Sequence, residues 1–93
     1  MAQNWTAKQT GFVQRYQPLV VQLMEVADQL AILNAEFTND TYGTGGANEI
    51  PDAIVQSVLP AATAAQFNSA EGAVVTILAT IASNRGYLEN MRP

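Results

Sequence analysis

Apolar side chains recur at helical spacing through the first half of the chain. They are Tyr16, Leu19, Leu23, Val26, Leu30, Leu33 and Phe37, and their spacings alternate between 3 and 4 residues. Residues at these spacings lie on one side of an α-helix. We call this set the leucine stripe. It predicts a long helix that packs against a partner surface.

The start of this helix and its proline need separate treatment. Thr6 and Gln9 fit a capping box, in which the hydroxyl and the amide side chain satisfy backbone groups of the first turn. Pro18 lacks an amide hydrogen and interrupts the hydrogen-bond ladder. Because Tyr16 and Leu19 stay in phase across the proline, we expect one helix over about residues 6–37, kinked or nearly continuous. A split at Pro18 into two helices is the alternative.

A connection with turn-forming residues follows at 38–49. It contains Gly-Thr-Gly-Gly at 43–46, but no Lys-Ser/Thr pair follows and neither nucleotide-binding fingerprint fits, so we interpret it as a flexible connection. Pro51 then suits the first position of a short helix over about 51–59. Its apolar side carries Ile54, Val55 and Val58. We expect it to fold across the open end of the long helices.

A second long helix is predicted over about residues 63–90. Thr63 and Gln66 repeat the capping-box pattern. Its apolar side carries Phe67, Ala70, Val74, Ile77, Ile81, Asn84, Leu88 and Met91. Two such helices joined by a connection pair most simply as an antiparallel hairpin, so the sequence predicts a single all-α domain over 1–93. Asn84 either sets the register of a helix pair or meets solvent.

Small residues form a second face on the last helix. We call this face the small ribbon; it consists of Ser69, Gly72, Thr76, Ala79, Ser83 and Gly86. Small side chains allow a neighbouring backbone to approach closely. We therefore predict that the small ribbon, with Ile54, Val55 and Val58 of the short helix, contacts other protein chains. A weakly polar face that meets solvent is the alternative.

Composition and charge narrow the range of functions. Only 13% of the 93 residues are charged, the net charge is −4, and there are four Lys and Arg residues in all. So few cations disfavour binding to nucleic acid or to an anionic membrane. A charge-poor surface suits a chain covered by neighbours, so an oligomer or assembly subunit is favoured over a free monomer. The uncharged runs of the second half are too polar or too short to span a bilayer.

The residues for catalysis are also sparse. There are no cysteines and no histidines, which removes the commonest zinc ligands and general base, and leaves the redox compartment open. Glu25 and Asp28 share a helix face and could hold a weak cation, but a solvated face explains them better. Neither a calcium loop nor a cleft around an acid pair is indicated. We expect no enzyme activity, no cofactor and no metal.

Three segments of the second half carry a family resemblance. They are the run Thr63-Ala-Ala-Gln-Phe-Asn-Ser-Ala-Glu-Gly-Ala, the segment Ile50-Pro-Asp-Ala and the ending Leu-x-x-Met-Arg-Pro. In these, and in being short, cysteine-free and rich in Ala, Gln and Asn, the chain resembles small helical virion proteins of tailed bacteriophages. The resemblance implies a capsid, connector or tail component located in the virion, and carries no catalytic residues.

Two functional hypotheses follow. The first is a structural or accessory subunit of a large assembly such as a phage particle, with other copies or virion proteins as partners. The second is a small adaptor or regulatory module, cytoplasmic and of secretion-system or antitoxin type, that binds one partner. The secretion type is similar only in length and hairpin shape, because no Trp-x-Gly turn lies between the helices.

Overall fold

The computed structural model describes residues 4–93. The regular secondary structure in that range consists of helices, with no strand. The helices are α1 (Trp5–Asn39), α2 (Asp52–Val58), α3 (Ala64–Ser83) and α4 (Arg85–Glu89). The predicted all-α class is confirmed, as is the order of a long helix, a short connecting helix and a second longer helix.

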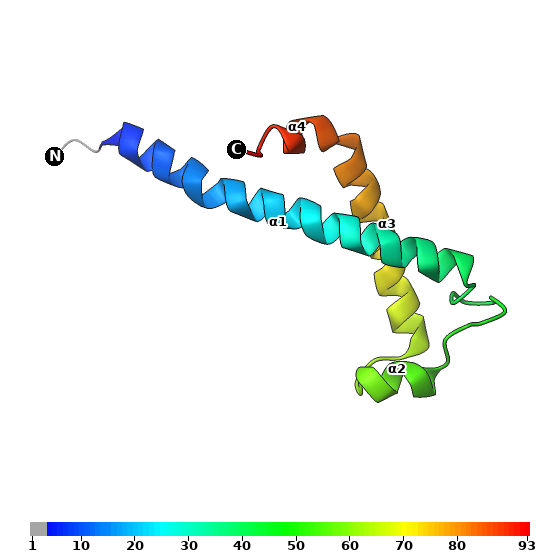
Figure 1. Ribbon diagram of the computed structural model, residues 1–93. Coiled ribbons are helices and arrows are strands. Elements are labelled where there is room, and N and C mark those ends of the chain that lie inside the picture. Colours follow the sequence, from blue (N-terminus) through cyan, green and yellow to red (C-terminus); the bar gives the residue numbers. More distant parts are fainter. Residues whose placement is uncertain (1–3) are drawn as a thin grey trace.

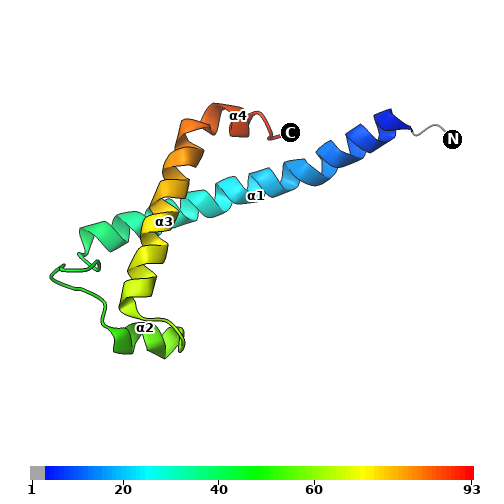
Figure 2. The same cartoon turned by 180° about the vertical axis from the view of Figure 1, so that it is seen from behind.

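The chain is elongated, with extents of 63 × 29 × 16 Å. Helix α3 runs in the direction opposite to α1 but crosses it obliquely instead of lying alongside it, and α2 packs at the start of α3 (Figure 1). Helix α4 turns back toward α1, and the N-terminal part of α1 extends well past the crossing (Figure 2). The two long helices therefore have the sense of the predicted hairpin but are in close contact over only part of α1.

The face of α1 that is buried is not the leucine stripe. Val20, Met24 and Ala27 are the buried residues of α1, and Met24 is fully enclosed. Leu19 and Tyr16 of the stripe keep 62% and 51% of their surface exposed. Each buried residue follows a residue of the leucine stripe by one position. The buried face of α1 is therefore rotated by roughly 100° about the helix axis from the predicted face. The expectation that the stripe forms the hairpin contact is wrong over most of its length.

Small residues explain this choice of face. Ala27 and Ala31 of α1 lie with Ile81 and Ala82 of α3 along one side of the crossing. Alanine side chains let two helix backbones approach closely, whereas a row of leucines would hold them apart. The crossing therefore uses the flank of the stripe and leaves most of the stripe itself uncovered.

Helix α1 begins before the predicted capping box. Asn4 is the cap, and its side-chain oxygen accepts the Ala7 amide at 3.2 Å. Thr6 consequently lies inside the first turn, and its predicted capping role is wrong. Pro18 lies within α1, which continues through it as one helix (Figure 1).

The last helix ends earlier than predicted. Helix α3 stops at Ser83, and Asn84 separates it from α4. The Asn84 amide side chain donates to the Thr80 carbonyl at 2.8 Å, which is the local competition by which asparagine interrupts helices. Asn84 is exposed, so its solvent-facing alternative holds in this chain. The capping box of Thr63 and Gln66 is confirmed, with both of its hydrogen bonds present.

The connection between α1 and α2 has an internal hydrogen-bond network. Asn48 donates its side chain to the Asp40 carbonyl at 2.9 Å and its backbone amide to the Thr41 carbonyl at 3.2 Å. A Cβ atom at Gly46 would overlap the Thr41 carbonyl oxygen, so only glycine fits this close backbone approach. The connection is thus a folded loop, more ordered than the flexible link predicted.

Candidate interaction surfaces

The contacts across the helix crossing define which surfaces are used within the chain. The rings of Phe37 and Phe67 lie 6.5 Å apart between centroids, and the Asn34 side chain donates to the Glu71 carboxylate. At the other side of the crossing, Arg85 of α4 binds Asp28 in a two-pronged ion pair. These contacts lie on one flank of α1 and fix α3 and α4 against it.

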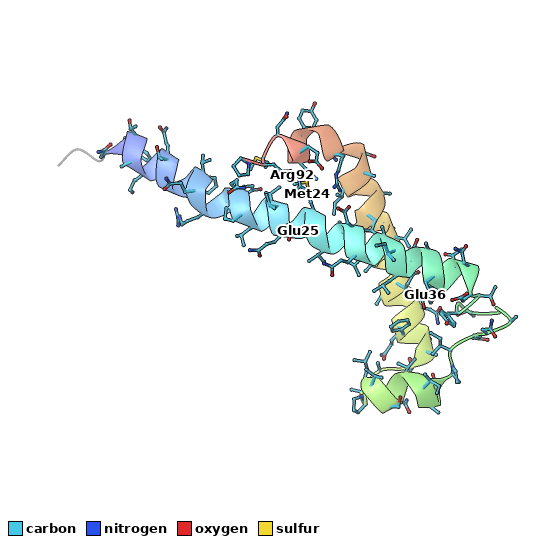
Figure 3. All side chains as sticks on the ribbon, viewed as in Figure 1. Met24, Glu25, Glu36 and Arg92 are labelled. Atoms are coloured by element: carbon cyan, nitrogen blue, oxygen red, sulfur yellow. The ribbon has the colours of Figure 1, made fainter. Side chains whose placement is uncertain are left out.

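Met24 packs where α4 and the end of the chain turn back onto α1. It is fully buried, and Figure 3 shows it on the side of α1 that faces the C-terminal segment carrying Arg92. Arg92 donates to Glu89 at 2.7 Å, and Glu89 also accepts from Arg85 at 2.8 Å. A small ionic cluster thus lies on α4 and the chain ending, the segment that Met24 faces.

The oblique crossing leaves an open apolar groove between α1 and α3. Its volume is about 320 Å³, and its lining residues are Leu30, Leu33, Asn34, Phe37, Phe67, Ala70, Glu71 and Val74. Three of these residues belong to the leucine stripe. The groove therefore joins the stripe to α3.

The leucine stripe continues toward the start of α1. Phe12 lies four residues before Tyr16, and the two rings stack with centroids 5.5 Å apart. Trp5 lies one further heptad back, and Gln9 is the polar member between them. Trp5 and Phe12 are 62% and 56% exposed. We call the row from Trp5 to Phe37 the extended stripe. This row is apolar except at Gln9 and exposed except at the half-buried Leu30 and Phe37, and so differs from the single exposed apolar residues that are ordinary on protein surfaces.

The small ribbon is uncovered. All six of its residues are exposed, and Cβ atoms built at Gly72 and Gly86 meet nothing within 4 Å. The Thr76 hydroxyl donates to the Gly72 carbonyl and the Ser83 hydroxyl to the Ala79 carbonyl, at 3.3 and 3.0 Å. The hydroxyl groups of Thr76 and Ser83 are therefore satisfied within α3. Gly86 lies in α4, beyond the break at Asn84, so the ribbon does not run along a single helix as predicted. Its role in binding stays a prediction.

The predicted residues of the short helix divide into two groups. Ile54 and Val58 are exposed at 58% and 76%, whereas Val55 is 5% exposed. Val55 lies with Phe67 of α3 beside a shallow hollow, and the Asp52 carboxylate accepts the Ala64 amide at 2.7 Å. Val55 and Asp52 hold α2 to α3, so only Ile54 and Val58 remain available for a partner.

Three surface groups have pKa values shifted by their neighbours. Hydrogen bonds from Arg85 first and Arg92 second lower the pKa of Glu89 below its usual value of 4.5. Hydrogen bonds to Asp28 and then Glu89 raise the pKa of Arg85. The charge of Asp40 raises the pKa of Tyr42, with smaller contributions from desolvation and Glu36. These shifts follow from structural ion pairs and charged neighbours.

The other predicted chemistry can be placed as well. Asp28, the proposed partner of Glu25 in a cation site, is engaged by Arg85 at 3.1 Å. Within residues 4–93, no group of three or more acidic side chains lies together in a way that could hold a metal ion. In the same range, no helix is long and apolar enough to cross a membrane.

The sequence pattern did not predict the polar pair in the crossing. Asn34 and Glu71 lie between apolar neighbours, and neither residue type signals an interface by itself. A signal was nevertheless present, because Val20, Ala27 and Asn34 repeat every seven residues along the flank of the leucine stripe. The polar pair lies on that row, because Asn34 belongs to it and bonds Glu71 of α3.

Comparison of the chain with protein-family models, curated proteins and solved structures gave no match in any of the three. The function is therefore inferred from the surfaces of the molecule.

Proposed function

We propose that this chain is a non-enzymatic structural or accessory subunit of a large protein assembly, with a bacteriophage virion as the favoured setting. The observation that carries the proposal is the extended stripe, which leaves a long row of apolar side chains, interrupted only at Gln9, along the single chain. A soluble monomer rarely leaves such a row uncovered, because burying it against another protein is favourable.

The small size of the internal core supports the same proposal. The buried residues of the described range are Val20, Met24, Ala27, Val55 and Ile81, all of them apolar. An elongated chain with so little buried surface gains only modest stability on its own. Contacts with neighbouring subunits would supply the rest, as in assemblies where folding and association are coupled.

The phage setting rests on the resemblance of the segments around Ile50 and Thr63 and of the chain ending to small helical virion proteins. A capsid, connector or tail component would use the extended stripe, the small ribbon and the exposed Ile54 and Val58 as contacts with its neighbours. The low proportion of charged residues, 13%, suits a surface that is largely covered in the particle.

An adaptor module that binds one protein partner is the second candidate. The groove between α1 and α3 favours it, because an apolar hollow of about 320 Å³ could receive a few side chains of a partner helix. This candidate predicts a stable monomer that forms a one-to-one complex.

Sedimentation of the purified chain separates the two. We expect concentration-dependent assembly at micromolar concentration if the chain is an assembly subunit. A well-folded, stable monomer under these conditions would contradict the assembly proposal and favour the adaptor.

The small ribbon has its own test. Replacing Gly72 or Ala79 with Leu should reduce assembly more than it reduces helicity, because the added side chain blocks close approach of a neighbouring backbone. Sedimentation and circular dichroism measure the two effects. Normal assembly of both variants would show that the small ribbon is a solvent face.

A further inference from the structure

We infer that two copies of this chain pair through the extended stripe of α1, with the two α1 helices antiparallel and overlapping along their full length. The inference rests on the proposed assembly function and specifies its first contact. Four observations carry it: the period of the stripe, the flank that α3 leaves open, the charge distribution along α1, and the place of the groove.

The period of the extended stripe is that of paired helices. Its members follow spacings of 4 and 3 in strict alternation from Trp5 to Phe37, which is the heptad pattern of a coiled-coil seam. Gly11 and Pro18, the two residues least suited to a seam, both fall on the side of α1 away from it. The seam spans roughly 48 Å, at about 1.5 Å per residue.

The exposed area of the stripe is sufficient for a stable dimer. Its exposed large side chains retain between 46% and 62% of their surface. Each therefore offers on the order of 100 Å² for burial. Together they approach the value of about 800 Å² per partner that is usual for specific interfaces.

Only one flank of the stripe is free to meet a second helix. On the other flank, Val20 and Ala27 are buried within the chain and Asn34 bonds Glu71 of α3. The opposite flank carries Lys8, Arg15, Gln22, Gln29 and Glu36, again at intervals of seven residues. An antiparallel two-fold pair brings the same flank of both copies together.

The charges on that flank select the antiparallel direction. Lys8 and Arg15 lie in its N-terminal part, whereas Glu36 lies near the other end of α1, next to the connecting loop (Figure 3). Full antiparallel overlap places Lys8 of each copy beside Glu36 of the other, with Gln22 beside Gln22 at the two-fold axis. Parallel overlap would instead set this flank against the flank with Val20, Ala27 and Asn34, which is covered within the chain.

The groove receives the aromatic end of the second copy in the same register. Full overlap sets Trp5 of one copy opposite Phe37 of the other, and Phe12 opposite Leu30. Leu30 and Phe37 line the groove. Exposed aromatic side chains that enter an apolar hollow are the typical anchors of protein interfaces. The exposed aromatic side chains of each copy thus enter the groove of the other copy, at both ends of the pair.

The single tryptophan provides a direct test. Trp5 and Leu33 lie far apart on one helix, so Leu33 can affect Trp5 fluorescence only through a second copy. We expect a blue shift of the emission as concentration rises. Leu33→Gln should abolish that shift and weaken association at least about tenfold, because one leucine is lost at each end of the pair.

Ile32→Gln is the matched control. Ile32 is 69% exposed and next to Leu33, but lies away from the stripe. This variant should keep the fluorescence shift and the association constant. Equal effects of the two variants, or a shift that persists in Leu33→Gln, would overturn the inference even if the chain still assembles, in which case the assembly function stands without this contact.

Direction and register need a second measurement. A spin label on Thr10→Cys should be separated from its counterpart by roughly 33 Å or more in the antiparallel pair. A parallel pair would bring the labels within about 20 Å, since packed helix axes lie about 8–10 Å apart. A label on Gln22→Cys should give a short distance, which confirms that pairing occurs. Short distances at both sites would overturn the antiparallel arrangement.

Charge exchange tests the flank contact at low salt. Lys8→Glu should weaken association about twofold to tenfold, and adding Glu36→Lys to it should restore association. A double variant as weak as the single one would show that these residues do not face each other. A chain that stays monomeric throughout would overturn both this inference and the assembly function.

Discussion

Two parts of α1, its middle and its N-terminal part, differ in the contacts that stabilise them. Around Met24 and Ala27 the helix is covered by α3 and α4, and its side chains are buried. Toward Trp5 and Phe12 the same helix projects past the crossing with its aromatic side chains exposed (Figure 1). The projecting arm, the part of α1 around Trp5 and Phe12, is held by hydrogen bonds and side-chain contacts along α1 itself, among them the Phe12–Tyr16 stack and Lys8 over the Trp5 ring. Isolated helices of that length are marginal in water. The comparison shows which part of α1 depends on a partner.

The largest expected difference between the two regions is in the effect of side-chain truncation. Met24→Ala should lower the free energy of unfolding by about 2 kcal/mol or more, because it leaves a cavity at the fully buried position. Leu19→Ala, at 62% exposure, should change it by less than about 0.5 kcal/mol in dilute solution. Denaturant titrations followed by circular dichroism measure both. Equal losses would show that the arm is packed as firmly as the crossing.

The second-largest effect concerns the loop that connects α1 to α2. Gly46→Ala should destabilise the chain by about 1–3 kcal/mol, because the new methyl group overlaps the Thr41 carbonyl. Gly72→Ala is the control on α3, where nothing lies within 4 Å. It should stabilise the chain by up to about 1 kcal/mol through helix propensity. Thermal unfolding of the two variants would contradict the loop structure if both moved in the same direction.

The third effect compares the caps of the two long helices. Thr63→Ala removes a complete capping box at the start of α3 and should cost about 1 kcal/mol. Asn4→Ala should fray the arm and speed amide exchange in its first turns, with little change in global unfolding. Thr6→Ala should be close to neutral, because Asn4 holds the cap. Hydrogen exchange resolves the three cases, and a global loss from Asn4→Ala would argue against an independent arm.

The smallest effect is the pH dependence of α4. The pKa of Glu89 is lowered in the folded chain, so its ion pairs contribute stability that is complete above the usual value of 4.5. That contribution is lost as the pH falls through the lowered folded value. We expect α4, in which Glu89 pairs with Arg85 and Arg92, to fray in this acidic range before the arm changes. NMR shifts of α4 report the transition, and Glu89→Gln should remove it; an unchanged transition in that variant would exclude Glu89 as its cause.

Local signals in the sequence determined most of the secondary structure. The apolar period around Leu23 and Leu30 predicted α1, and the Thr63 capping box located the start of α3 to the residue. These features depend on contacts between residues three or four positions apart, which the sequence displays directly. The phase of the apolar residues across Pro18 likewise predicted that α1 would continue through it.

Only the tertiary structure decided which face of α1 is buried. By hydrophobicity the leucine stripe was the stronger candidate, but the alanines at 27 and 31 permit the closer approach, so α3 packs on their side. The spacing of apolar residues indicates that a helix face is buried, but it does not identify the partner. Burial against the same chain and burial against another chain give the same pattern in the sequence. The polar pair of Asn34 and Glu71, the groove and the break at Asn84 depend likewise on how α3 and α4 meet α1 in space.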